Sequence, residues 1–128
     1  MPPLATIIED DQSLSEIFQA AVEAAGYETQ TYLDGALALV ALQSETPTLV
    51  VLDIHLPKVS GLTILKSIRN QSRLDKTWVV VITADSAAAD LLRGEAAADF
   101  VLDKPVTFIQ LRDLATRLHP DNAPGGRK

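Results

Sequence analysis

Short apolar runs alternate with longer stretches of helical spacing along the chain. Three runs hold apolar or β-branched residues at consecutive positions, as central parallel strands covered on both faces do: 4–8, 49–52 and 78–82. Two weaker runs, 28–32 and 100–102, are expected to be strands nearer an edge of the same sheet. The pattern therefore predicts five strands.

Each interval between strands has the spacing of an amphipathic helix. The first has apolar residues at i, i+3, i+4 and i+7 from Leu14, with Ser13 and Glu16 as a predicted capping box and Gly26 after its end. The later helices are predicted over 35–44 behind Asp34 as N-cap, 62–70, 86–98 with an interruption at Gly94, and 108–118 behind a capping box of Thr107 and Gln110. This alternation predicts an α/β protein of (βα)5 form.

Length and composition narrow the organisation and the class of protein. The chain has 128 residues, of which 47% are apolar, so we expect one domain over residues 1–119 and a flexible tail over 120–128. It has no cysteine, which excludes disulfides and thiolate metal sites. A net charge of −6 disfavours direct binding to nucleic acid or to anionic membranes. No apolar run reaches the roughly 20 residues of a membrane span, and no signal-peptide pattern is present, so a cytoplasmic protein is predicted.

Polar residues fall where the predicted strands end. Glu9 and Asp10 follow the first strand, Asp53 the third, Thr83 the fourth and Lys104 the fifth. Because the carboxyl ends of parallel strands share one edge of the sheet, where such folds bind ligands, these side chains are expected to meet. Carboxylates this close require a cation, and an incomplete set of hard oxygen ligands suits Mg²⁺, which retains waters and shares a phosphate oxygen.

This set of residues suits phosphoryl transfer. Asp53 is the candidate nucleophile, and Mg²⁺ on Glu9 and Asp10 would neutralise the charge of the transferring oxygens. Thr83 can donate a hydrogen bond to one phosphoryl oxygen, and Lys104 can pair with another.

Other polar and glycine residues nearby have simpler interpretations. Asp11 is expected to be a helix cap or turn residue, and His55 a loop residue that contributes its backbone carbonyl rather than its ring. Asp85 fits two roles equally well, as a cap of the next helix or as a neighbour of the site that tunes hydrolysis. Gly61 is expected to be a flexible junction between loop and helix.

Four motifs in order resemble the receiver domain of two-component response regulators, the CheY-like family, over residues 4–118. They are Ile-Ile-Glu-Asp-Asp after the first strand, Leu-Asp-Ile-His-Leu-Pro at Asp53 with Gly61 eight residues later, Ile-Thr-Ala at Thr83, and Asp-Lys-Pro at Lys104. The resemblance implies a flavodoxin-like fold, a doubly wound five-stranded parallel sheet with strand order 2-1-3-4-5.

The resemblance also implies a metal ion and a residue that accepts a phosphoryl group. By this resemblance Asp53 accepts a phosphoryl group in the presence of Mg²⁺. The metal ligands are then Asp53, the acidic pair Glu9 and Asp10, and the backbone carbonyl of His55. The phosphoryl donor is a histidine kinase or a histidine phosphotransfer protein. The output is a contact with a downstream protein or with a second copy, so the chain is a signalling domain and not an enzyme.

The remaining matches to the family concern phosphate binding and switching. Lys104 matches the lysine that pairs with the phosphoryl group, and Thr83 matches the hydroxyl that moves toward it. Ala84 is small, which in the family leaves the phosphoryl group accessible to donors and water. The bond between Lys104 and Pro105 is at the position that the family often holds cis.

One position departs from the family pattern. Three residues before Lys104 the family usually has Tyr or Phe, whose ring turns inward on activation, but this chain has Val101. Phe100 comes one residue earlier and, with a strand period of two, is expected on the opposite face of the sheet. The segment between Thr83 and Lys104 is also about one residue short for the family. These departures leave open a receiver-like interaction module that no longer switches on phosphorylation.

Two further alternatives use related chemistry or a related fold. A haloacid dehalogenase-like phosphatase also uses an Asp nucleophile with a Thr and a Lys, but His55 stands where its second Asp would be, and there is no room for a cap domain. Flavin binding is disfavoured because carboxylates follow the first strand, where a phosphate needs hydroxyls or glycines.

Overall fold

The computed structural model describes residues 1–127 and contains one five-stranded parallel sheet. Its strands are β1 (Leu4–Ile8), β2 (Glu28–Tyr32), β3 (Leu49–Asp53), β4 (Trp78–Thr83) and β5 (Phe100–Asp103). They lie in the order β2-β1-β3-β4-β5, so the two weaker runs form the edges of the sheet, and the predicted doubly wound (βα)5 fold is confirmed.

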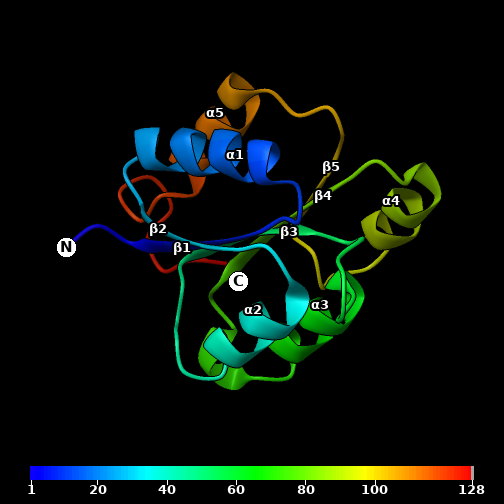
Figure 1. Cartoon of the computed structure of the whole chain (residues 1–128). Helices are drawn as coiled ribbons and strands as arrows, with labels where there is room; N and C mark the ends of the chain where they lie inside the picture. The colour runs from blue at the N-terminus through cyan, green and yellow to red at the C-terminus, as the bar shows by residue number, and fades with distance from the viewer. Residues whose placement is uncertain (128) are drawn as a thin grey trace.

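Helices cover both faces of this sheet (Figure 1). They are α1 (Gln12–Ala24), α2 (Gly35–Ala41), α3 (Gly61–Arg69), α4 (Ser86–Arg93) and α5 (Phe108–Leu118), with a 3₁₀ turn η1 (Ser72–Leu74) before β4. α1 and α5 lie on one face, and α2, α3 and α4 lie on the other. Within β3, Val51 packs on the first face, whereas Val50 and Leu52 pack on the second. Burial on both faces explains why the central strands are apolar at consecutive positions.

The start of α1 differs from the prediction. The helix begins at Gln12, and Asp11 is its N-cap, with a carboxylate oxygen that accepts the Leu14 N–H at 3.0 Å. The predicted capping box of Ser13 and Glu16 is therefore wrong, because the chain is already helical at Ser13. The expected role of Asp11 as a helix cap is confirmed.

The other four helices start within one residue of their predicted starts, but α2 and α4 end earlier than predicted. Asp34 is the N-cap of α2, and Thr107 with Gln110 forms the capping box of α5. α4 ends at Arg93 with Gly94 as its C-cap, so the predicted interruption at Gly94 is the end of the helix.

α2 ends at Ala41, before the predicted end at residue 44. The carbonyl groups that a helix end leaves without partners need donors from elsewhere. The guanidinium of Arg73, in η1, donates to the carbonyl oxygens of Leu42 at 2.6 Å and Glu45 at 2.8 Å. A side chain 31 residues away in sequence therefore supports this end of α2.

The C-terminal segment turns back to the amino edge of the sheet. Bends and turns follow α5 over residues 119–125, and the Arg127 N–H donates to the Lys76 carbonyl oxygen at 3.3 Å. Figure 1 shows this segment in red beside the start of the strands. The sequence indicates flexibility here and does not predict these contacts. Lys128, the last residue of the predicted tail, lies outside the described residues.

Candidate functional site

Three carboxylates meet at the carboxyl edge of the sheet. Glu9 and Asp10 follow β1, and Asp53 is the last residue of the neighbouring strand β3. One oxygen atom from each carboxylate lies within 4.8 Å of the others, with Glu9 and Asp53 buried and Asp10 exposed. Oxygen ligands in this arrangement can hold a metal ion. The sequence predicts this cluster from the ends of the strands.

Lys104 supplies the positive charge at this edge. It follows β5, and its Nζ lies 2.9 Å from Glu9 Oε1 and 3.4 Å from Asp53 Oδ2. Burial lowers the pKa of Lys104, but the hydrogen bond to Glu9 and the charges of Asp53 and Glu9 outweigh burial, so the pKa is raised. One ammonium faces three carboxylates, so the cluster keeps a negative charge.

Glu9 is the most deeply buried carboxylate of this cluster. Its side chain is 1% exposed, and burial raises the pKa of Glu9 to about 7, with a smaller increase from the charge of Asp53. Hydrogen bonds from Lys104 and from the Asp11 N–H act in the opposite direction without reversing the shift. A carboxylate that is this costly to ionise gains from a nearby cation.

The loop after β3 holds Asp53 in place. The His55 N–H donates to Asp53 Oδ1 at 3.1 Å, and the Gly61 N–H donates to the Ile54 carbonyl oxygen at 2.8 Å. A Cβ atom on Gly61 would overlap the carbonyl oxygen of Asp53. Gly61 is therefore needed because its lack of a side chain lets α3 start against the Asp53 backbone. The sequence instead predicted that Gly61 would make this junction flexible.

A hydrogen-bonded chain links the loops after β3 and β4. Thr83 is buried, and its Oγ accepts the Asp85 N–H at 3.0 Å, while Ala84 between them is exposed. Asp85 caps α4 by accepting the Ala88 N–H at 3.0 Å, and its other oxygen lies 3.0 Å from His55 Nε2. The hydrogen bond from Ala88 has the larger effect and the contact with His55 the smaller, and both lower the pKa of Asp85. The cap role of Asp85 is confirmed, whereas the sequence did not predict its contact with His55, although each stands two positions after a strand end.

The first two residues of β5, Phe100 and Val101, face opposite sides of the sheet, as predicted. Phe100 packs on the face covered by α1 and α5, where its ring centroid lies 6.2 Å from that of Trp78. Val101 packs on the face covered by α2, α3 and α4. No ring stands at residue 101 to turn inward. The peptide bond between Lys104 and Pro105 is cis, the geometry that the family resemblance implies at this position.

Known proteins share both this sequence pattern and this fold. The profile of the "Response regulator receiver domain" family matches residues 5–116. This chain belongs to that family. A receiver domain is a phosphoacceptor signalling domain, and receivers of this family take phosphate from histidine kinases. With the family shown, the phosphatase and flavin-binding alternatives are not supported.

Individual relatives agree with the family match. The "Polar-differentiation response regulator DivK" of Brucella anthropi is 32% identical over 108 residues, which cover 84% of this chain and 88% of that protein. The "Phosphate regulon transcriptional regulatory protein PhoB" of Rhizobium meliloti is 32% identical over 112 residues, 87% of this chain but 49% of that protein. The chain thus spans about half the length of the first curated relatives it matches.

A solved structure shows the same fold. The chemotaxis response regulator CheY4 of Vibrio cholerae has a TM-score of 0.81 at 24% identity, over 92% of this chain and 99% of that chain. Nothing in these comparisons favours the receiver-like module that no longer switches. Among residues 1–127, no helix is both long and apolar enough to cross a bilayer. The cytoplasmic location and the lack of direct nucleic-acid binding stay predictions.

Proposed function

We propose that Asp53 is the phosphoacceptor of this receiver domain, and that Asp53, Glu9, Asp10 and the backbone carbonyl of His55 hold Mg²⁺. The observation that supports this most is the cluster of three carboxylate oxygens within 4.8 Å, which includes Asp53. Such ligands leave positions for water and for a phosphoryl oxygen, as Mg²⁺ requires. The ion would neutralise negative charge on the phosphoryl oxygens.

The proposed reaction transfers a phosphoryl group between two proteins. A carboxylate oxygen of Asp53 attacks phosphorus, the bond from phosphorus to the donor's histidine nitrogen breaks, and that nitrogen keeps the electron pair. Lys104, which contacts Asp53 and Glu9, pairs with one phosphoryl oxygen. The Thr83 hydroxyl donates to another, and the small, exposed Ala84 leaves room for the donor to approach.

The proposed signal passes from one protein contact to another. The donor is a histidine kinase or a histidine phosphotransfer protein, and the receiver spans residues 1–119. Its own residues catalyse both phosphorylation and loss of phosphate at Asp53. The phosphorylated form changes its contact with a downstream protein or with a second copy. Because Val101 replaces the usual aromatic residue, this output does not depend on a rotating ring.

Intact mass after incubation with Mg²⁺ and acetyl phosphate tests the assignment of Asp53. We expect a gain of one phosphoryl group, lost in EDTA and in Asp53→Asn. Asp10→Asn is expected to need more Mg²⁺ for the same gain. The matched control is Asp11→Asn, which neutralises the adjacent carboxylate outside the cluster, keeps a competent helix cap, and is expected to leave the Mg²⁺ requirement unchanged. A gain that persists in Asp53→Asn, or a wild-type chain that neither gains mass nor binds beryllofluoride, contradicts the proposal.

A further inference from the structure

A second charged cluster lies at the amino edge of the sheet, opposite the phosphoacceptor site. Asp99, directly before β5, accepts hydrogen bonds from Arg69 at 3.1 Å, from Arg127 at 2.8 Å and from the Val79 N–H at 2.8 Å. Its side chain is 11% exposed, and those of Arg69 and Arg127 are 15% and 18% exposed. Burial, and then the neighbouring Arg127 charge, lower the pKa of Arg69. The three side chains therefore form one tightly connected ionic cluster, mostly withdrawn from water.

Arg127 connects this cluster to the C-terminal segment, residues 120–127, which we call the strap. Besides Asp99, its guanidinium donates to the carbonyl oxygens of Ala96 at 3.1 Å and Asp75 at 3.4 Å. Its backbone N–H donates to the Lys76 carbonyl oxygen at 3.3 Å. Arg127 thus ties the strap both to the loop between α4 and β5 and to the segment before β4.

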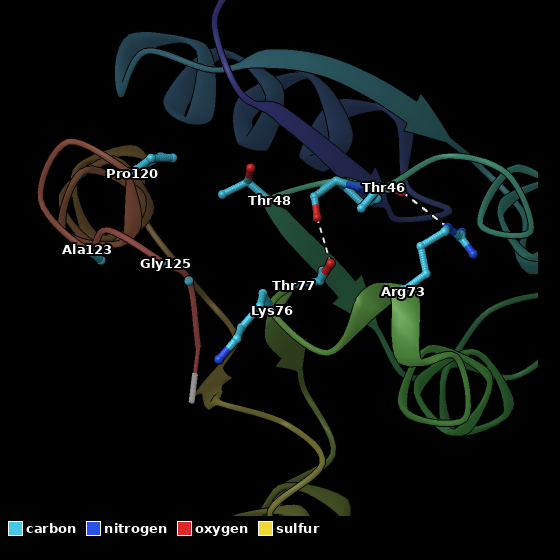
Figure 2. Close-up of a pocket in the computed structure, with 10 residues that line it drawn as sticks. Thr46, Thr48, Arg73, Lys76, Thr77, Pro120, Ala123 and Gly125 are labelled. Carbon is cyan, nitrogen blue, oxygen red and sulfur yellow. Dashed lines mark hydrogen bonds between the residues drawn. The ribbon is translucent and has the colours of Figure 1, made fainter.

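Before Arg127 the strap spans a pocket instead of packing on the sheet. The pocket has a volume of about 240 Å³. Figure 2 shows Pro120, Ala123 and Gly125 of the strap on one side of it, with Lys76 and Thr77 on the other. None of residues 120–127 is buried. Near its start the Asn122 side-chain amide donates to the Thr116 carbonyl oxygen of α5 at 2.8 Å. Beyond that contact, the strap is held across the pocket by its last residues and not by a buried apolar side chain.

Gly126 lies where the strap passes close to the backbone of Lys76. Its φ is +71°, a conformation that favours glycine. A Cβ atom here would also overlap the carbonyl oxygen of Lys76. Arg127 and Gly126 consequently hold the end of the strap against the segment before β4 and the loop that contains Asp99.

α4 connects the strap to the phosphoacceptor site. One end of the helix is capped by Asp85, whose N–H donates to the Thr83 hydroxyl. The loop after its other end leads to Asp99. Only Ala89 and Leu92 of α4 are buried, so the helix can shift with little loss of buried surface.

We propose that the strap is a latch coupled to Asp53: Arg127 holds the loop between α4 and β5 through Ala96 and Asp99, and a phosphoryl group on Asp53 releases this contact. This inference rests on the proposed function, in which the Thr83 hydroxyl moves toward a phosphoryl oxygen. That movement displaces Asp85 and the start of α4, and the loop after this short helix follows. The latch gives this chain a readout that needs no aromatic ring in β5.

Hydrogen exchange on the full chain tests the release of the strap. The comparison is Mg²⁺ alone against Mg²⁺ with beryllium fluoride, which stands in for the phosphoryl group. With beryllofluoride bound, we expect the amides of the strap and of residues 94–99 to exchange about fivefold faster or more. Unchanged exchange in the strap at saturating beryllofluoride would overturn the proposal.

Coupling between two sites is reciprocal. If beryllofluoride at Asp53 favours the open strap by some factor, opening the strap must strengthen beryllofluoride binding by that same factor. Arg127→Gln, and independently Gly126→Ala, are expected to lower the beryllofluoride dissociation constant about fivefold, measured by NMR titration. The matched control is Arg112→Gln, since Arg112 pairs with its neighbour Asp113 on α5. It is expected to leave the constant unchanged.

The titration also separates failure of the latch from failure of the proposed function. Dissociation constants within about twofold of wild type in both latch variants would overturn the latch alone. A wild-type chain that shows no beryllofluoride binding would overturn the proposed function, and the coupling with it.

Discussion

The two edges of the sheet gather charge in opposite ways. At the carboxyl edge three carboxylates face a single ammonium, that of Lys104, and burial raises the pKa of Glu9 to about 7. At the amino edge two guanidinium groups share the carboxylate of Asp99, which also accepts a backbone N–H. The first edge has more negative than positive charge and suits a cation and a phosphoryl group, at a cost in stability. The second has two guanidinium groups on one carboxylate and connects segments that are distant in sequence.

Removing Asp99 is expected to have the largest effect on stability. Asp99→Ala leaves the Arg69 guanidinium and the Val79 N–H without the carboxylate that both now bind, at a mostly buried position. We expect a loss of about 3 kcal/mol in the free energy of unfolding, measured by urea denaturation.

Asp103→Ala is the matched control for that change. Asp103 pairs with Arg93 at 2.8 Å, but the two side chains are 55% and 43% exposed. Solvent screening keeps the expected loss below about 1 kcal/mol. If both variants lost the same free energy of unfolding, the cluster around Asp99 would stabilise the protein no more than an exposed surface ion pair does.

Neutralising Glu9 is expected to stabilise the protein in EDTA. The folded pKa of about 7 lies above the ordinary value of 4.5, so between these pH values the folded chain holds a proton that the unfolded chain has lost. The free energy of unfolding therefore falls as pH rises through this range, and the full cost is present above pH 7. Glu9→Gln is expected to gain about 2 kcal/mol near pH 8 and almost nothing near pH 4.5.

Urea denaturation at the two pH values measures the effect of Glu9→Gln. Glu16→Gln, which removes an exposed carboxylate from α1, is the control and should change stability little at either pH. If Glu9→Gln raised the free energy of unfolding equally at both pH values, the cost of Glu9 would not come from its ionisation.

The sequence predicts the carboxyl edge well because topology determines it. Runs of consecutive apolar residues mark buried parallel strands, and the ends of such runs must share one edge, which brings Glu9, Asp53 and Lys104 together. The amino edge depends on contacts that no periodicity records. Arg127 reaches Asp99 across 28 residues, and a segment that ends in Gly-Gly-Arg-Lys reads as flexible.

Replacing Gly61 tests the close contact behind the phosphoacceptor. A Cβ atom in Gly61→Ala would overlap the Asp53 carbonyl oxygen, so α3 or the end of β3 must shift. We expect a loss of about 2 kcal/mol in stability and slower labelling by acetyl phosphate. Gly94→Ala is the control, because its Cβ would meet the nearest atom at an ordinary 3.5 Å, and we expect a change within about 0.5 kcal/mol. Labelling at the wild-type rate in Gly61→Ala would show that this contact does not position Asp53.

Asp11 shows that not every carboxylate at the carboxyl edge is short of a partner. Its oxygen accepts the Leu14 N–H, so Asp11→Ala is expected to cost about 1 kcal/mol in stability and to leave phosphoryl labelling intact. Ser13→Ala should cost almost nothing, because Ser13 already lies inside α1. Asp11 and Ser13 are both competent caps, and the path of the chain out of β1, which sequence does not record, decides between them. If Ser13→Ala were the more costly change in urea denaturation, the helix would start two residues later in solution, as the sequence pattern favours.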